Sequence, residues 1–182
     1  IMGQRALAQL LLSNLSLNAS TIVLHVAVYA AFLFALGFAW RRHATSVVVI
    51  CVVFLLFYGL SHFSGTVFFA PSDMTHAVFI AVALSLRLGA APLRTCAVVG
   101  ALYGALIAQF DILTGGVPVG LAVIALMVGH GASDLRLFMR HIAIVVAAFC
   151  IAFVCCVVIR LLVVSLIEGS NQFAVHFPSF LR

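Results

Sequence analysis

The ionisable residues of this 182-residue chain are few, and one carboxylate stands out among them. Asp111 ends an apolar stretch, GALYGALIAQF, and is followed by a turn sequence that contains Thr114, Gly115 and Gly116. A carboxylate beside a hydrocarbon core is costly and needs water or a partner. Asp111 can accept hydrogen bonds from the backbone donors of that turn, or it can lie at the membrane interface and only mark a loop. Both interpretations stay open.

Arg160 is the second residue of interest, because it interrupts the last long apolar run of the chain. Its guanidinium either reaches the interface along its aliphatic stem or pairs with a carboxylate. The candidate carboxylates are those of Asp73, Asp111 and Glu168. We predict an ordering or interaction role for Arg160, not a catalytic one.

Signatures of catalysis and of metal binding are absent from the sequence. There is no HExxH segment, nucleotide-binding glycine loop or Ser-His-Asp arrangement. His62 and His76 are candidates for a bis-histidine haem, but both flank a loop, where histidine is ordinarily solvated. The five cysteines lie inside apolar runs without metal-ligand spacing, as small core residues do: Cys51, Cys96, Cys150, Cys155 and Cys156. We therefore predict no catalytic residue, no metal and no cofactor.

Composition defines the class of protein. Apolar residues make up 66% of the chain, charged residues 7%, and the mean hydropathy is +1.34. These values predict an all-α, polytopic integral membrane protein with room for about six transmembrane helices. The net charge of +5 is spread over several loops, so it indicates membrane topology and not a nucleic-acid surface.

Apolar runs divide the chain into three parts. Residues 1–20 form a mixed segment predicted to be interfacial, residues 21–167 form one transmembrane helical domain, and residues 168–182 form a polar and aromatic tail. The predicted spans are residues 21–40, 45–63, 74–88, 95–110, 117–131 and 142–159, the last continued by 161–167. Residues 133–141 (SDLRLFMRH) are predicted to form a polar bend.

Arginine pairs occupy every second connection between these spans. They are Arg41 and Arg42, Arg87 and Arg94, and Arg136 and Arg140. The alternate connections hold Asp73 and Asp111 and no arginine. Six spans with the three pairs in the cytoplasm satisfy the positive-inside rule, so both termini are expected to face outward.

Glycines around Asp111 predict close helix packing. Gly100 and Gly104 lie four residues apart, which gives a helix a flat face against a neighbour. Gly115 and Gly116 supply a tight turn, and Gly120 follows in the next apolar segment.

From residue 41 to 166 the chain resembles the rod shape-determining MreD family of bacterial inner-membrane proteins. The resemblance rests on residues 71–73, the basic bend at 87–94, GALYG at 100–104, and DILTGG at 111–116 with Gly120. It implies a fold similar to the substrate-binding S subunits of energy-coupling-factor transporters. It also implies a multi-pass protein of the bacterial inner membrane that associates with an MreC-like partner and peptidoglycan synthases. The span at 21–40 has no counterpart in the family, and the family's last helix has none here.

Three functions from different classes are consistent with the sequence. The first is a non-enzymatic scaffold subunit of the cell-shape and peptidoglycan elongation complex. The second is a vitamin-type small-molecule binding subunit of a transporter, for which Tyr58, Tyr103, Gln109 and Asp111 are the candidate polar groups. The third is an accessory subunit of a respiratory or photosynthetic complex. In each case the expected partners are membrane lipid and other integral membrane proteins, with no nucleic acid.

Overall fold

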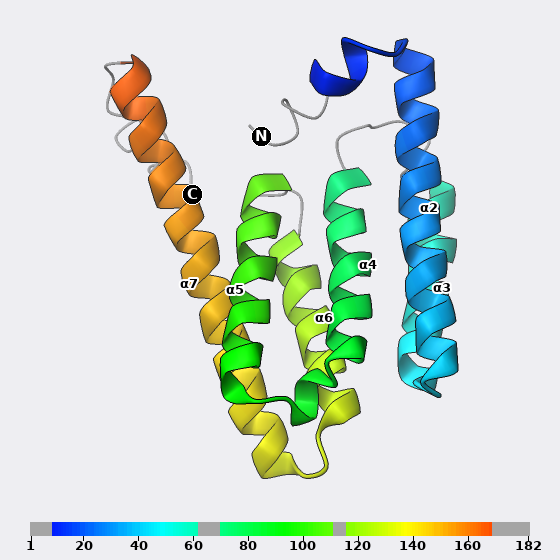
Figure 1. Ribbon diagram of the computed structural model, residues 1–182, viewed down its shortest axis with the longest axis vertical. Helices are drawn as coiled ribbons and strands as arrows, with labels where there is room; N and C mark the ends of the chain where they lie inside the picture. The colour runs from blue at the N-terminus through cyan, green and yellow to red at the C-terminus, as the bar shows by residue number, and fades with distance from the viewer. Residues whose placement is uncertain (1–8, 62–69, 111–115, 169–182) are drawn as a thin grey trace.

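A computed structural model describes residues 9–61, 70–110 and 116–168 (Figure 1). Within these ranges the chain is helical and contains no strand, so the all-α prediction is confirmed there. The helices are α2 (Leu17–Arg41), α3 (Thr45–Ser61), α4 (Ala70–Ser85), η1 (Leu88–Ala90, a 3-10 turn), α5 (Leu93–Phe110), α6 (Gly116–Gly131) and α7 (Leu135–Glu168).

Three of these helices are long and apolar enough to cross a membrane. They span Leu17–Arg41, Leu93–Phe110 and Leu135–Ile167. The apolar helices Asp73–Ser85 and Gly116–Gly131 are shorter. The composition and these three helices together indicate a membrane protein.

The predicted polar bend at residues 133–141 is wrong, because α7 already begins at Leu135. The carboxylate of Asp134 accepts a hydrogen bond from the backbone N–H of Leu137 at 2.8 Å, as an N-capping residue does. His141 is buried two turns further on, with both ring nitrogens 2.9 Å from a carbonyl oxygen, one of Leu137 and one of Ala91. The polar residues of this stretch thus start a helix and fix it to the chain between α4 and α5.

The helix α2, which contains the first predicted span, also starts earlier than predicted. Ser16 caps α2 by accepting a hydrogen bond from the N–H of Ala19 at 3.3 Å. The hydroxyl groups of Ser20 and Thr21 each donate a hydrogen bond to the backbone carbonyl oxygen four residues earlier in the chain. These polar residues are therefore accommodated within the helix. The predicted boundary at residues 20 and 21 therefore falls inside α2.

The six helices α2 to α7 alternate in direction along the chain (Figure 1). α2 and α3 lie at one edge, α4, α5 and α6 occupy the middle, and α7 lies on the opposite side and extends past α4, α5 and α6 at the upper end. The connections α2–α3, α4–α5 and α6–α7 lie at the lower end in this view, whereas α2 begins and α7 ends at the upper end. The closest association is between α5 and α7.

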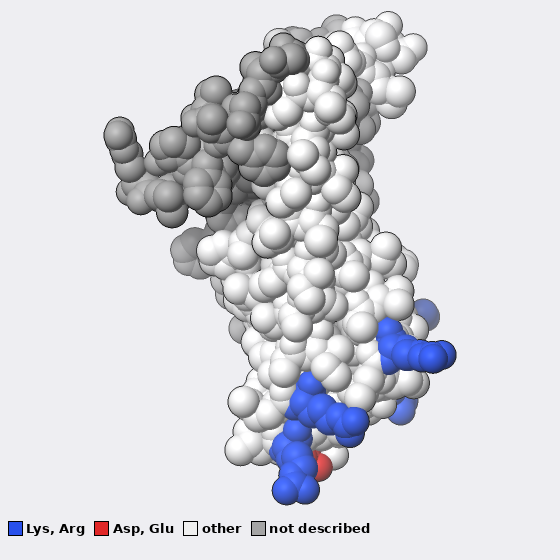
Figure 2. All heavy atoms as spheres, turned by 90° about the vertical axis from the view of Figure 1, so that its left-hand side faces the viewer, with Lys and Arg blue, Asp and Glu red and all other residues white. Residues whose placement is uncertain are grey.

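The three arginine pairs lie at the lower end of the bundle. Each pair lies at or next to a lower connection: Arg41 and Arg42 after α2, Arg87 and Arg94 around η1, and Arg136 and Arg140 in the first turns of α7. In Figure 2 the charged atoms in view gather at that end, and the rest of the described surface in view carries none. The arginine pairs that alternate along the sequence thus lie together at one end of the structure.

The core lies between α4, α5, α6 and the first half of α7, and α2 and α3 extend it. The second half of α7 has few buried residues and exposes large apolar side chains, among them Val154, Leu166 and Ile167. A soluble monomer rarely exposes so continuous an apolar surface. The second half of α7 is therefore suited to contact lipid or another protein.

Candidate functional site around Tyr103

Gly100 and Gly104 place the backbones of α5 and α7 in direct contact. A methyl group built on Gly100 would lie 2.5 Å from the carbonyl oxygen of Val145, and one built on Gly104 would overlap the carbonyl oxygen of Phe149. Carbonyl oxygens of a helix cannot retreat as a flexible side chain can. The glycine face predicted from the sequence is therefore occupied by a helix of the same chain.

Gly120 contributes to the same region from α6. A methyl group there would lie 3.2 Å from the ring of Phe149 and 3.6 Å from that of Tyr103. The absence of a side chain leaves room for both rings. Gly116, the first residue of α6, is also buried.

Tyr103 is at the centre of this arrangement, which we call the Tyr103 cluster (Tyr103, His76, Phe79 and Phe149). Its ring stacks on Phe79 of α4 with centroids 3.9 Å apart and planes 11° apart. It also meets the Phe149 ring of α7 at a centroid distance of 5.4 Å. Three helices thus contribute rings, and Gly120 brings the fourth helix against them.

A buried hydrogen bond joins two members of the Tyr103 cluster. Nδ1 of His76 lies 2.5 Å from the phenol oxygen of Tyr103, and each side chain is only 2% exposed. Asp73 and Thr75, in the same first turns of α4, are buried as well. A polar group taken out of water requires such partners, since an unmade hydrogen bond inside a protein is costly.

Arg160 lies higher on α7 and reaches α5. Its Nη1 donates a hydrogen bond to the carbonyl oxygen of Ala108 at 3.3 Å. Ala108 is among the last four residues of α5, whose carbonyl groups have no partner within the helix. Nη2 of Arg160 is buried and has no hydrogen-bond partner among the described residues. This contact is compatible with the ordering role expected of Arg160, and the alternative of a carboxylate partner stays open for Asp111, which lies outside the described residues.

Two predicted site residues, Asp111 and Gly115, lie outside the described residues. The positions of the other predicted residues form two groups. Gly100, Gly104 and Gly120 surround Tyr103 and Phe149, while Arg160 contacts the last turn of α5.

Sequence reasoning missed the role of His76. Its position beside a loop predicted a solvated interface residue, yet the structure buries it against Tyr103. A usable signal was present in α5: Tyr103 lies three residues after Gly100 and directly before Gly104, so the ring must share the closely packed side of that helix. Nothing in the sequence pointed to histidine as its partner.

The chemistry available to the Tyr103 cluster is hydrogen bonding and aromatic packing. The described residues contain no group of three His, Cys, Asp or Glu side chains placed to hold a metal ion. The chain has no match among protein-family models, curated proteins or solved structures.

Proposed function

We propose that this chain is a non-enzymatic scaffold subunit of a bacterial inner-membrane complex for cell shape and peptidoglycan elongation, resembling MreD. In this proposal all six helices α2 to α7 cross the membrane, with the arginine-bearing end in the cytoplasm. The alternating direction of the helices supports this topology, as does the gathering of the three arginine pairs at one end.

Helix lengths are compatible with six spans, although they are unequal. At 1.5 Å per residue, the 16 residues of α4 or α6 give about 24 Å, and the 34 residues of α7 give about 51 Å. The hydrocarbon core is about 30 Å thick. Short helices surrounded by longer neighbours are tolerated by local thinning of the bilayer, and α7 would tilt or extend beyond it.

The observation that carries the proposal is the packing around Tyr103. A small-molecule carrier resembling an S subunit needs a pocket with convergent polar groups inside the bundle. Tyr103 was a candidate for such a group, but its ring is stacked on Phe79 and its hydroxyl is bonded to His76. Aromatic rings pack where α4, α5 and α7 meet, and the hollow of about 180 Å³ beside Tyr103 between α4 and α5 is lined almost wholly by apolar side chains. Without convergent polar groups around such a space, a scaffold is favoured over a carrier.

Exposed apolar surface on α7 provides room for a partner. Leu166 is 83% exposed on the part of α7 that extends beyond its neighbours α5 and α6. A second transmembrane protein can pack there without disturbing the bundle. Partners of an MreC-like kind, and the peptidoglycan synthases, are the proposed occupants by resemblance.

The test is to identify neighbours of the chain in native membranes. A photo-crosslinking amino acid is placed at Leu166 of α7, and a matched control at Val26, which is 62% exposed on α2. We expect an MreC-like protein or a peptidoglycan synthase to be captured from position 166 and not from position 26. Depletion of the chain should widen the cells.

Other results of the same experiment would assign the chain to another class. Capture of ATP-hydrolysing transporter subunits would favour the carrier, and a haem or pigment spectrum in the purified complex would favour the respiratory or photosynthetic subunit. Normal cell shape on depletion, together with either result, would refute the scaffold.

A further inference from the structure

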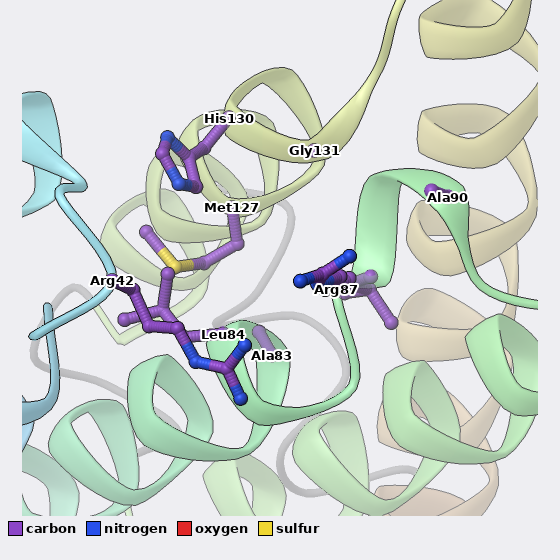
Figure 3. Close-up of a pocket in the computed structure, with 9 residues that line it drawn as sticks. Arg42, Ala83, Leu84, Arg87, Ala90, Met127, His130 and Gly131 are labelled. Atoms are coloured by element: carbon purple, nitrogen blue, oxygen red, sulfur yellow. The ribbon is translucent and has the colours of Figure 1, made fainter.

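A cavity at the arginine-bearing end is distinct from the Tyr103 cluster. Its volume is about 330 Å³, and it lies between the α2–α3 connection, α4, η1 and α6. The larger side chains that line it include Arg42, Leu84, Arg87, Met127 and His130 (Figure 3). Arg42 enters from one side and Arg87 from the other, and His130 stands above them in this view.

The wall that carries Arg87 is held by close backbone contact. A methyl group on Gly89 would overlap backbone atoms of Val128, Gly131 and Ala132 at the end of α6, and one on Gly131 would lie 2.9 Å from the nitrogen of Gly89. These two glycines therefore fix η1 against the end of α6. Arg87 precedes η1 with φ 49° and ψ 58°, a left-handed conformation that is unfavourable for a residue with a side chain. The arginine at the edge of the cavity is therefore held in an unfavourable backbone conformation.

The cavity is cationic. Its lining contains two guanidinium groups and an imidazole, and no acidic side chain among the described residues. Neither guanidinium donates a hydrogen bond to another described residue. Cζ of Arg42 lies over the ring of Phe38 at 5.4 Å from its centroid, and this cation–π contact is not a hydrogen bond to a protein acceptor.

A simpler role for these arginines would be to balance helix dipoles. α2, α4 and α6 all end near the cavity, and cations are favourable at the carbonyl ends of helices. An arginine with that role alone would be expected to donate hydrogen bonds to the terminal carbonyl groups. Arg42 and Arg87 do not, and their charges line a shared hollow where each repels the other.

We propose that this cavity binds a phosphoryl group, either on the headgroup of an anionic lipid or on a small soluble phosphate compound. Guanidinium groups match phosphate oxygens in a bidentate fashion, and an anion between Arg42 and Arg87 removes their mutual repulsion. The volume is at the lower end of the range for small-ligand sites. Basic pockets between helices at a cytoplasmic membrane face are suited to lipid headgroups.

The experiment uses the full chain in detergent and native mass spectrometry with phosphatidylglycerol, phosphatidylcholine and inorganic pyrophosphate as probes. The test variant is Arg42→Gln with Arg87→Gln. The matched control is Arg136→Gln with Arg140→Gln, which removes the same charge from the same end of the molecule at exposed positions outside the cavity. A third variant, Arg87→Gly, suits the left-handed backbone and removes only the guanidinium.

We expect phosphatidylglycerol or pyrophosphate to bind the wild type at least tenfold more tightly than phosphatidylcholine does. The test variant should lose at least tenfold in that affinity and the control less than twofold. Arg87→Gly should melt no lower than the wild type yet bind more weakly. Tight binding of pyrophosphate identifies a soluble ligand, and binding of phosphatidylglycerol alone identifies a lipid. Equal losses in the two double variants, no loss in the test variant, or no preference for either anion in the wild type would overturn the proposal.

Discussion

Nδ1 of His76 and the phenol oxygen of Tyr103 form a buried hydrogen bond that joins the first turns of α4 to the middle of α5. Both side chains are almost fully withdrawn from solvent, so each depends on the other for part of its hydrogen bonding. Near this bond, α7 lies against α5 because Gly100 and Gly104 carry no side chain. α6 lies against the rings of Tyr103 and Phe149 because Gly120 carries none. The bond thus lies where four helices meet.

Removing the hydroxyl should destabilise the bundle. Tyr103→Phe preserves the ring that stacks on Phe79 but takes the phenol away from the buried imidazole. We expect a loss of about 1–3 kcal/mol in the free energy of unfolding, measured in mixed micelles. His76→Leu combined with Tyr103→Phe should cost less than the sum of the single changes, because the double variant buries neither polar group. Strictly additive effects would mean that the two groups do not interact.

The glycine contact between α5 and α7 can be tested against a matched glycine. Gly104→Ala introduces a methyl group that overlaps the carbonyl oxygen of Phe149, so we expect a loss of about 1–3 kcal/mol. Gly37, four residues before the end of α2, has no atom within 4 Å of the equivalent position. Gly37→Ala should therefore be neutral or stabilising by up to about 1 kcal/mol, since alanine favours a helix. Equal stability of the two variants, measured by thermal unfolding, would contradict the close packing.

The sequence predicted this glycine face but not its partner. Two small residues four apart show that a helix is approached closely, yet the same spacing serves a helix of the same chain or of another protein. Apolar runs located the helices well, because their lengths depend on composition over many residues. The start of α7 was mispredicted, since Asp134 and His141 look like loop residues when their capping and buried contacts are unseen. The His76–Tyr103 pair connects positions 27 apart, and no local pattern encodes such a contact.

Membrane topology gives a third prediction. Cysteine is introduced at Ser133, in the α6–α7 connection, and at Asn14, ahead of α2, and labelled with a membrane-impermeant maleimide. With six spans, Asn14→Cys should react in intact cells and Ser133→Cys only after the membrane is opened. Thr66→Cys and Thr114→Cys, at positions outside the described residues, should behave as Asn14→Cys does. Labelling of Ser133→Cys in intact cells would refute the orientation, and protection of position 66 or 114 would refute six spans.

The final prediction concerns Asp111 and the arginine that reaches the end of the helix before it. Arg160 donates to the carbonyl oxygen of Ala108, three residues before Asp111, and its Nη2 has no hydrogen-bond partner among the described residues. If Asp111 only orders the following turn, it acts as a hydrogen-bond acceptor, so Asp111→Asn should be milder than Asp111→Leu. Arg160→Met would then cost little, because loss of one hydrogen bond is offset by removal of a half-buried cation whose Nη2 is unpaired among the described residues.

An ion pair between Asp111 and Arg160 would produce a different pattern. Breaking it from either side would cost about 3–5 kcal/mol, so Asp111→Asn, Asp111→Leu and Arg160→Met would all be severe. The combination of Asp111→Leu with Arg160→Met would recover much of the loss, since no charge is left alone. We expect the first pattern, with thermal unfolding and recovery of the partner complex as the measurements. Wild-type behaviour of Asp111→Leu would show that neither role applies and that residue 111 only marks a loop.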